Sequence, residues 1–88
     1  MHLYYMITYI LATCMPGTEK EVIQMIKVLP NVEEVNGIMG KYDIFIKIQV
    51  DDALKIDTTI SKIRSVPNVT STISIPAIYG QGGTIDDK

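Results

Sequence analysis

The sequence predicts an α+β domain of the ferredoxin-like plan, with the order βαββαβ, a four-stranded antiparallel sheet and two helices on one face of it. One observation is the pattern of apolar residues, which alternate along strand-like segments and recur at helical spacing between them. The other is an internal repeat at an offset of 37 residues, which carries Leu29-Pro30-Asn31-Val32 onto Val66-Pro67-Asn68-Val69. The chain is therefore a doubled strand-helix-strand unit, and right-handed crossovers place its first and third strands at the centre of the sheet.

The first half begins with a strand over residues 5–13 that is apolar at both parities, which indicates that both of its faces are covered. Thr18 and Glu21 have the spacing of a capping box, which predicts the start of a helix. An apolar stripe at helical spacing follows, formed by Val22, Met25, Ile26 and Leu29. Pro30 ends the helix because proline is poorly accommodated in a helix interior. Residues 32–39 are expected to form the second strand.

Two turns compete in the hairpin between the second and third strands. Asn36-Gly37 is the strongest two-residue hairpin signal, but a turn there leaves a preceding strand of only four residues and puts Gly40 inside the next strand. We favour the turn at Gly40-Lys41, with a bulge or distortion at Asn36-Gly37. The third strand then covers residues 42–50.

The second half repeats this organisation. The third strand directs one set of alternate side chains to the core, namely Ile44, Ile46, Ile48 and Val50. Asp51-Asp52 can cap a second helix. Its apolar stripe consists of Ala53, Ile56, Ile60 and Ile63. The last strand covers residues 69–78, and Pro76 indicates an edge position or the end of that strand.

Two faces are expected for the last strand. One carries Val69, Ser71, Ile73 and Ile75, and the other carries Thr70, Thr72 and Ser74. The domain should occupy residues 1–79, followed by a glycine-rich, acidic and flexible tail over residues 80–88.

No helix is left to cover the second face of the sheet. We expect that face to show Met6, Thr8, Ile10 and Ala12 of the first strand together with Phe45 of the third. Packing against the sheet of a second copy is the simplest way to bury it. The sequence therefore predicts a homodimer.

The composition limits the classes of function. The chain is 47% hydrophobic and 20% charged, so part of its apolar surface is expected to face a partner. Its net charge of −2 gives it no excess of positive charge to attract the phosphates of nucleic acid. The apolar opening over residues 3–14 lacks a basic flank and is too short to span a bilayer. We expect a cytoplasmic protein that contacts neither membrane nor nucleic acid directly.

The sequence offers few residues for catalysis or for metal binding. Cys14 is the single cysteine, and it has no base candidate beside it in the sequence. It is expected to be a small apolar residue at a strand end. His2 is the single histidine and stands at the N-terminus, where a solvated side chain is the expected role. No catalytic residue, metal or cofactor is predicted.

Asp43 is the best candidate for contact with a ligand. It stands beside a turn, at the start of an apolar run that has no obvious structural use for a carboxylate. A carboxylate beside a turn commonly accepts backbone hydrogen bonds. The functional interpretation is that it pairs with the ammonium group of a ligand.

The segment from Gly40 to Ile44 resembles the G-x-Y-D signature of the ligand-sensing (RAM) domain of the Lrp/AsnC transcriptional regulators. The resemblance extends over residues 5–79 and includes the element order, the acidic pair that opens the second helix, and Pro-x-Val before a final strand rich in threonine and serine. Full-length members carry an N-terminal helix-turn-helix, whereas only four residues precede the first predicted strand here. The resemblance therefore implies a stand-alone sensing domain.

The resemblance also implies a mode of assembly and a ligand site. Domains of the family dimerise through their sheets, dimers associate into rings of eight or ten chains, and amino acids bind between dimers near the hairpin. The resemblance implies that Gly40, Lys41 and Tyr42 offer backbone groups to the carboxylate of an amino-acid effector and that Asp43 meets its ammonium. It also implies that Thr72 and Ser74 contribute hydroxyl groups. A DNA-binding partner of the Lrp type would receive the signal.

Two other functions are compatible with the sequence. The first is an assembly module without a ligand, because a shared fold does not guarantee an occupied site. The second is a small enzyme of the dimeric ferredoxin-like monooxygenase type, which shares the same plan but for which the sequence offers no acid-base or aromatic cluster.

Overall fold

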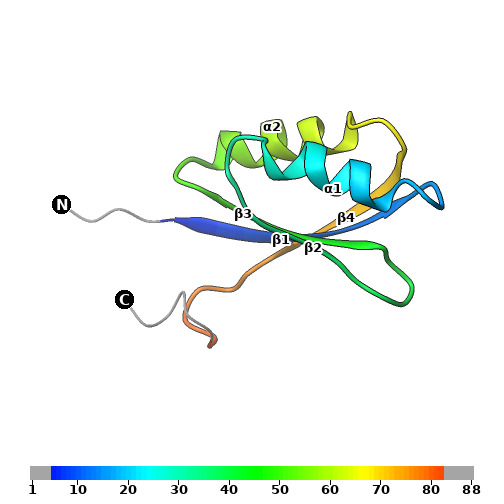
Figure 1. Cartoon of the computed structure of the whole chain (residues 1–88). Coiled ribbons are helices and arrows are strands. Elements are labelled where there is room, and N and C mark those ends of the chain that lie inside the picture. Colours follow the sequence, from blue (N-terminus) through cyan, green and yellow to red (C-terminus); the bar gives the residue numbers. More distant parts are fainter. Residues whose placement is uncertain (1–4, 83–88) are drawn as a thin grey trace.

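The chain alternates strands and helices in the predicted order. The computed structural model describes residues 5–82. Its elements are β1 (Met6–Cys14), α1 (Glu19–Lys27), β2 (Val32–Gly37), β3 (Ile44–Val50), α2 (Ala53–Arg64) and β4 (Val69–Pro76). The strands form one antiparallel sheet in the order β2-β3-β1-β4. Both helices pack on the same face of this sheet (Figure 1). The ferredoxin-like plan with β1 and β3 at the centre is confirmed.

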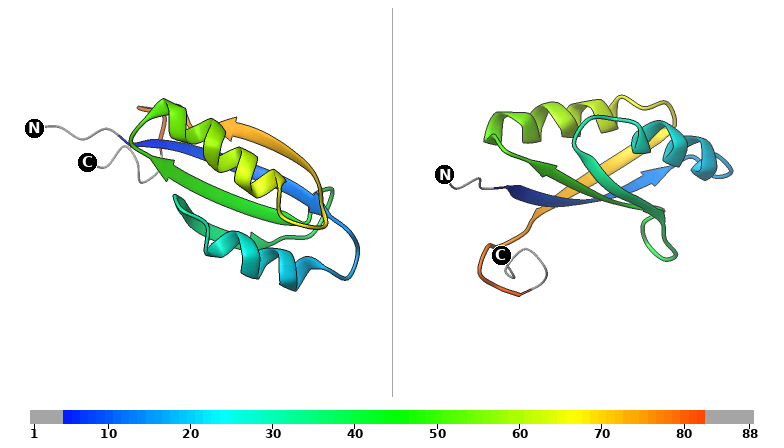
Figure 2. Two further views of the ribbon diagram at one scale, coloured as in Figure 1. Left: turned by 90° about the horizontal axis from the view of Figure 1, so that it is seen from above. Right: turned by 60° about the vertical axis from the view of Figure 1, so that its left-hand side comes forward.

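The helices lie side by side above the sheet. Seen from above, α1 lies along β2, and α2 lies over the region between β3 and β4 (Figure 2). The core fills the space between the two layers. Its fully buried side chains are Ile10, Ala12, Val22, Ile26, Ile44, Ile46, Ile48 and Ile63. The predicted core face of β3 is therefore confirmed.

The faces of β1 were assigned wrongly from the sequence. Ile10 pairs with Ile46, so the even-numbered residues of β1 share the helix face with the buried isoleucines of β3. The opposite face, which we call the open face, shows Ile7, Tyr9, Leu11 and Thr13 in place of the predicted even-numbered residues. Because β1 is apolar at both parities, hydrophobicity alone did not choose between its faces, and the pairing register did. Phe45 lies on the open face as predicted, and its ring stacks on Tyr9 with the centroids 5.7 Å apart.

A register shift splits β4 into two parts. Cys14 pairs with Val69 but Thr13 pairs with Ser71, so one extra residue of β4 lies between these pairs. Val69 consequently packs against the core on the helix side, whereas Ser71 lies on the open face. The prediction that both share a face is wrong, because a bulge reverses the alternation that the sequence pattern assumes.

The helices begin in different ways. The Asp52 carboxylate accepts a hydrogen bond from the Leu54 N–H at 2.9 Å, so the predicted cap of α2 is confirmed. The Thr18 hydroxyl donates instead to the Met15 carbonyl at 2.6 Å and does not cap α1. The predicted capping box is therefore absent. The Met15 carbonyl also accepts a hydrogen bond from the Thr18 N–H at 3.1 Å. It is thus a local acceptor for the Thr18 hydroxyl, and this bond competes with capping of the helix.

The internal repeat appears as equivalent backbone bonds at the end of each helix. Leu29 N–H donates to the Ile26 carbonyl at 3.0 Å, and Val66 N–H donates to the Ile63 carbonyl at 3.1 Å. The asparagine that follows the proline is left-handed in both copies, with φ of 70° at Asn31 and 77° at Asn68. Asparagine tolerates this conformation better than most residues, which explains why it occupies both positions.

The predicted tail, residues 80–88, is described only as far as residue 82. The six residues beyond it and the predicted solvated His2 lie outside the described residues. The division into a domain over residues 1–79 and a flexible tail stays a prediction.

Candidate functional site

The connection between β2 and β3 carries most of the predicted site residues. Ile38 N–H donates to the Asp43 carbonyl at 2.9 Å and closes a loop over residues 38–43. Gly40 has φ of 129°, a conformation that side-chain-bearing residues rarely adopt. The turn therefore lies around Gly40-Lys41, as we favoured. Tyr42 is half-buried, whereas Gly40 and Lys41 are exposed, so their backbone groups can be reached from outside.

The alternative turn at Asn36-Gly37 is excluded by the pairing of β2. Asn36 pairs with Phe45 and Gly37 with Ile44 in regular register. The bulge predicted at this dipeptide is also wrong, because the irregularity of β2 lies between Val32 and Glu34. Tertiary pairing with a long central strand has overridden the local turn signal.

Asp43 is anchored to the neighbouring central strand. One oxygen of its carboxylate, Oδ2, accepts a hydrogen bond from the Cys14 N–H at 2.9 Å, and the Asp43 N–H donates to the Ala12 carbonyl at 2.9 Å. Within residues 5–82, Oδ1 has no hydrogen-bond partner. The carboxylate thus has a structural role, with one oxygen held in place, and it keeps an acceptor for a further donor. Cys14 itself is buried in the core, as predicted.

Thr72 and Ser74 are not brought to the hairpin in a single chain. They lie on the edge strand β4, opposite Ala12 and Ile10, and therefore on the helix side of the sheet. The whole width of β1 separates β4 from β3.

A cluster of three hydroxyl groups was missed by the sequence analysis. The Thr13 hydroxyl makes hydrogen bonds with that of Thr70 at 2.7 Å and with that of Ser71. The bulge of β4 makes this possible, because it presents two successive residues to one residue of β1. Thr13 directly precedes Cys14, the residue that holds Asp43, so the cluster and the carboxylate flank the same peptide group. The run Thr70-Ser71-Thr72 was the available signal, but nothing in it reveals the bulge.

An exposed ion pair lies at the other end of β3. Lys55 hydrogen-bonds to Asp51 at 2.9 Å, which holds the pKa of the Asp51 carboxyl below its ordinary value of 3.8. The same contact raises the pKa of the Lys55 ammonium above 10.5. Both side chains are exposed, so solvent screens the pair.

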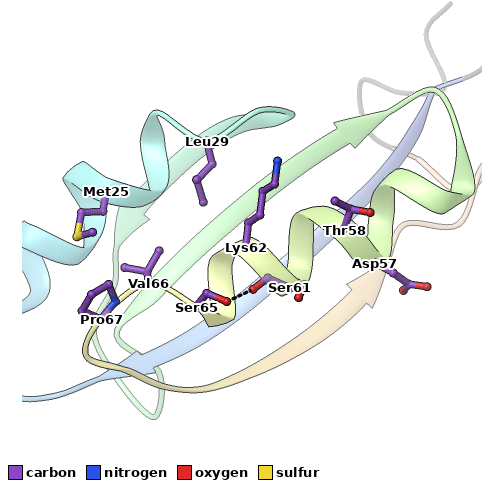
Figure 3. A pocket seen from close by; sticks show the side chains of 9 residues that line it. All are labelled: Met25, Leu29, Asp57, Thr58, Ser61, Lys62, Ser65, Val66 and Pro67. Carbon is purple, nitrogen blue, oxygen red and sulfur yellow. Dashed lines mark hydrogen bonds between the residues drawn. The ribbon is translucent and has the colours of Figure 1, made fainter.

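A shallow groove of about 700 Å³ separates the two helices (Figure 3). Its apolar part is formed by Met25, Leu29, Val66 and Pro67, and its polar part by Asp57, Thr58, Ser61, Lys62 and Ser65. Met25 was predicted on the buried stripe of α1, but 44% of it is exposed here because it points into this groove and not onto the sheet. Ala53, predicted on the stripe of α2, is also exposed.

The described residues offer neither a metal site nor a membrane-spanning helix. Within residues 5–82, no three His, Cys, Asp or Glu side chains come together in a way that could hold a metal ion. No helix in the same part of the chain is long and apolar enough to cross a membrane.

Comparisons with solved structures agree with the fold. FFRP-DM1 is 31% identical, with a TM-score of 0.78 over 83% of this chain and 99% of that chain. Hypothetical protein PHS023 from Pyrococcus horikoshii is 30% identical, with a TM-score of 0.78 over 86% of this chain and 93% of that chain. The transcriptional regulator NMB0573 from Neisseria meningitidis, solved as a complex with L-Met, is 12% identical, with a TM-score of 0.76 over 89% of this chain and 53% of that chain.

One curated protein also matches part of the chain. Homocitrate synthase from Sulfurisphaera tokodaii is 38% identical over 53 residues, which amount to 60% of this chain but only 12% of that enzyme. The model of the Lrp/AsnC ligand binding domain matches residues 8–78, from within β1 to just beyond β4. This chain therefore belongs to the family of Lrp/AsnC ligand binding domains.

Proposed function

We propose that this domain senses an amino acid and passes the signal on through assembly, without catalysing a reaction. The observation that carries the proposal is the state of Asp43, whose carboxylate is fixed through one oxygen while the other has no hydrogen-bond partner within residues 5–82. A pre-positioned carboxylate is a good acceptor for an ammonium group, because little entropy is lost when the ligand binds. The exposed backbone of Gly40 and Lys41 is the partner for the effector's carboxylate.

The hydroxyl cluster supplies the polar contacts that an amino acid needs beyond its ammonium group. Thr13, Thr70 and Ser71 already satisfy one another, so each can exchange a mutual bond for a bond to ligand without being left unpaired. Thr72 and Ser74 take part only from a neighbouring chain in this proposal, since they lie on the helix side of the sheet and the cluster lies with Ser71 on the open face. The effector site in this proposal lies between chains.

Association through the open face supports such a site. The open face has an apolar half along β1 and β4 that extends to Phe45 of β3, and its residues are Tyr9, Leu11, Phe45, Ile73 and Ile75. Its polar half includes Glu34 and Asn36 of β2 and Lys47 of β3. Ile73 and Ile75 are more than 40% exposed in the single chain. Burial of this apolar half against a second copy removes the exposed surface, and a homodimer follows. Octameric or decameric rings would be built from such dimers.

The proposed output is regulation of transcription inside the cell, through co-assembly with a DNA-binding partner of the Lrp type. Membership of the family supports this role. The L-Met complex of the Neisseria regulator supports an amino acid as the kind of effector.

A second output is favoured by the match to homocitrate synthase. A segment similar to this chain makes up a small part of that enzyme. The domain could therefore regulate an enzyme by the same effector binding, with the enzyme in place of the DNA-binding partner. Pull-down of each kind of partner with and without effector separates the two outputs.

Thermal melting of the purified protein with each of the twenty amino acids at millimolar concentration tests the proposal. A ligand at 100 times its dissociation constant should stabilise the folded protein by about 2.7 kcal/mol. We expect a selective upward shift that is lost in Asp43→Asn, since asparagine can still accept from the Cys14 N–H but carries no charge. Asp57→Asn, which removes a charge on α2, is the matched control and should keep the shift. A flat panel would overturn amino-acid sensing and favour an assembly module.

A further inference from the structure

The two edges of the sheet differ in how they are protected. β2 is six residues long, carries Glu33 and Glu34, and has an irregular register with β3. β4 is eight residues long and carries no ionisable side chain. Charges, short length and irregularity are the usual means by which edge strands avoid pairing with other chains. Only β2 has them.

Within residues 5–82, the backbone groups of two residues of β4 point away from the sheet. Ala77 N–H donates to the Ile7 carbonyl at 2.9 Å, so the backbone groups of odd-numbered residues in this part of β4 point toward β1. Backbone groups alternate along a strand, and those of Thr72 and Ser74 therefore point outward. Pro76 occupies the next outward position, and it has no N–H to offer there. β4 is an edge strand of the sheet, and seen from above neither helix extends outward past it (Figure 2).

We infer that β4 pairs antiparallel with β4 of a second copy, in a register centred on Ile73. In this register Thr72 lies opposite Ser74 of the second copy, and each residue exchanges N–H···O hydrogen bonds with the other. The twofold axis repeats the same pair on its other side. The sheets of the two copies then form one continuous sheet.

Side chains favour a second copy of β4 as the occupant. β-Branched and hydroxyl-bearing residues are good cross-strand partners in antiparallel pairs, and five of the eight residues of β4 are β-branched. An uncharged strand can meet its own copy without repulsion, whereas pairing of β2 with its copy would bring glutamates together. Ile73 would meet its counterpart across the axis on the open face, beside Leu11, so the new contact continues the apolar half of that face.

A charge-swap experiment tests both the contact and its register. In Thr72→Lys/Ser74→Lys, each lysine faces another lysine across the pair, which destabilises the contact. We expect the mass of the ligand-free protein, measured by sedimentation velocity, to fall to half that of the wild type. In Thr72→Lys/Ser74→Glu, the same positions carry opposite charges that face each other, and the wild-type mass should be kept.

Two results would overturn the inference. Wild-type mass in the lysine pair would show that β4 does not mediate assembly, and halved mass in the lysine-glutamate variant would contradict the register. Far-ultraviolet circular dichroism of both variants checks that each remains folded. Because the mass is measured without ligand, failure of amino-acid sensing would leave this result unaffected.

Discussion

The two faces of the sheet use the same strands for different purposes. On the helix face, alternate residues of β1 and β3 are aliphatic and almost completely buried, as Ile10 and Ile46 illustrate. On the open face, the residues between them are mixed: Tyr9 stacks on Phe45, and Lys47 stands next to it on the same strand. Burial within one chain stabilises the fold. A mixed and half-exposed face is what an interface between chains requires.

The largest expected effect breaks the helix face. Ile46→Ala removes a completely buried side chain and should lower the free energy of unfolding by about 3 kcal/mol, because the tightly packed core cannot close the cavity. Lys47→Ala, one residue along and on the open face, should cost less than about 1 kcal/mol. Urea unfolding of both variants measures the difference, and equal losses would contradict the separation of the faces.

Charge on the open face should change assembly more than stability. Phe45→Glu places a carboxylate in the apolar half of that face, so we expect folded protein whose dimer dissociates at least about tenfold more readily. Gln49→Glu adds the same charge on the same strand and face, but at a position that is already polar, and serves as the control. Sedimentation equilibrium compares them. Unchanged association in Phe45→Glu would exclude this face as the dimer contact.

Loss of the hydroxyl cluster should have a smaller effect on stability. Thr13→Val keeps the shape of the side chain but removes its hydrogen bonds to Thr70 and Ser71, which we expect to cost about 1 kcal/mol or less since water can replace them. Thr58→Val removes a hydroxyl that donates to a helix carbonyl and is the control. If the cluster contacts the effector, only Thr13→Val should weaken the ligand-induced shift in melting temperature.

The smallest effect belongs to the exposed pair at the far end of β3. Asp51 has a lowered pKa, so its contribution to stability is complete above about pH 4 and disappears as the pH falls through the lowered value. Lys55 has a raised pKa, so its contribution is complete below its ordinary value of 10.5 and disappears as the pH rises through the raised one. Asp51→Asn should flatten both changes. Melting temperatures at neutral pH and at the acid and alkaline extremes measure them.

The order of elements and the strand order could be predicted because each rests on local spacing or on chain connectivity. The Asp52 cap needs only its own neighbours, and the two central strands follow from the handedness of the crossovers. The faces of β1 depend on which residue of β3 stands opposite, a nonlocal fact that the apolar pattern does not contain. The bulge of β4 is nonlocal in the same way.

The candidate site was predicted in part for the same reason. Asp43 and Gly40 could be named from the turn and the resemblance, and the structure places both in one loop. The anchoring of Asp43 by Cys14 joins residues 29 positions apart in the chain, and the bond between Thr13 and Thr70 spans 57. Contacts over such separations arise only when the sheet assembles.

The bonding of Ala77 to Ile7 has a mechanical consequence. Tyr5 and Ala77 stand at the same end of two adjacent antiparallel strands, β1 and β4. A force that pulls these two residues apart loads the hydrogen bonds of the ladder one after another, beginning at that end, and not all of them together. The ladder between β1 and β4 should therefore separate one hydrogen bond at a time and at low force. A pulling force applied at these two residues would detach β4 from β1 before it disrupts the packing of the core.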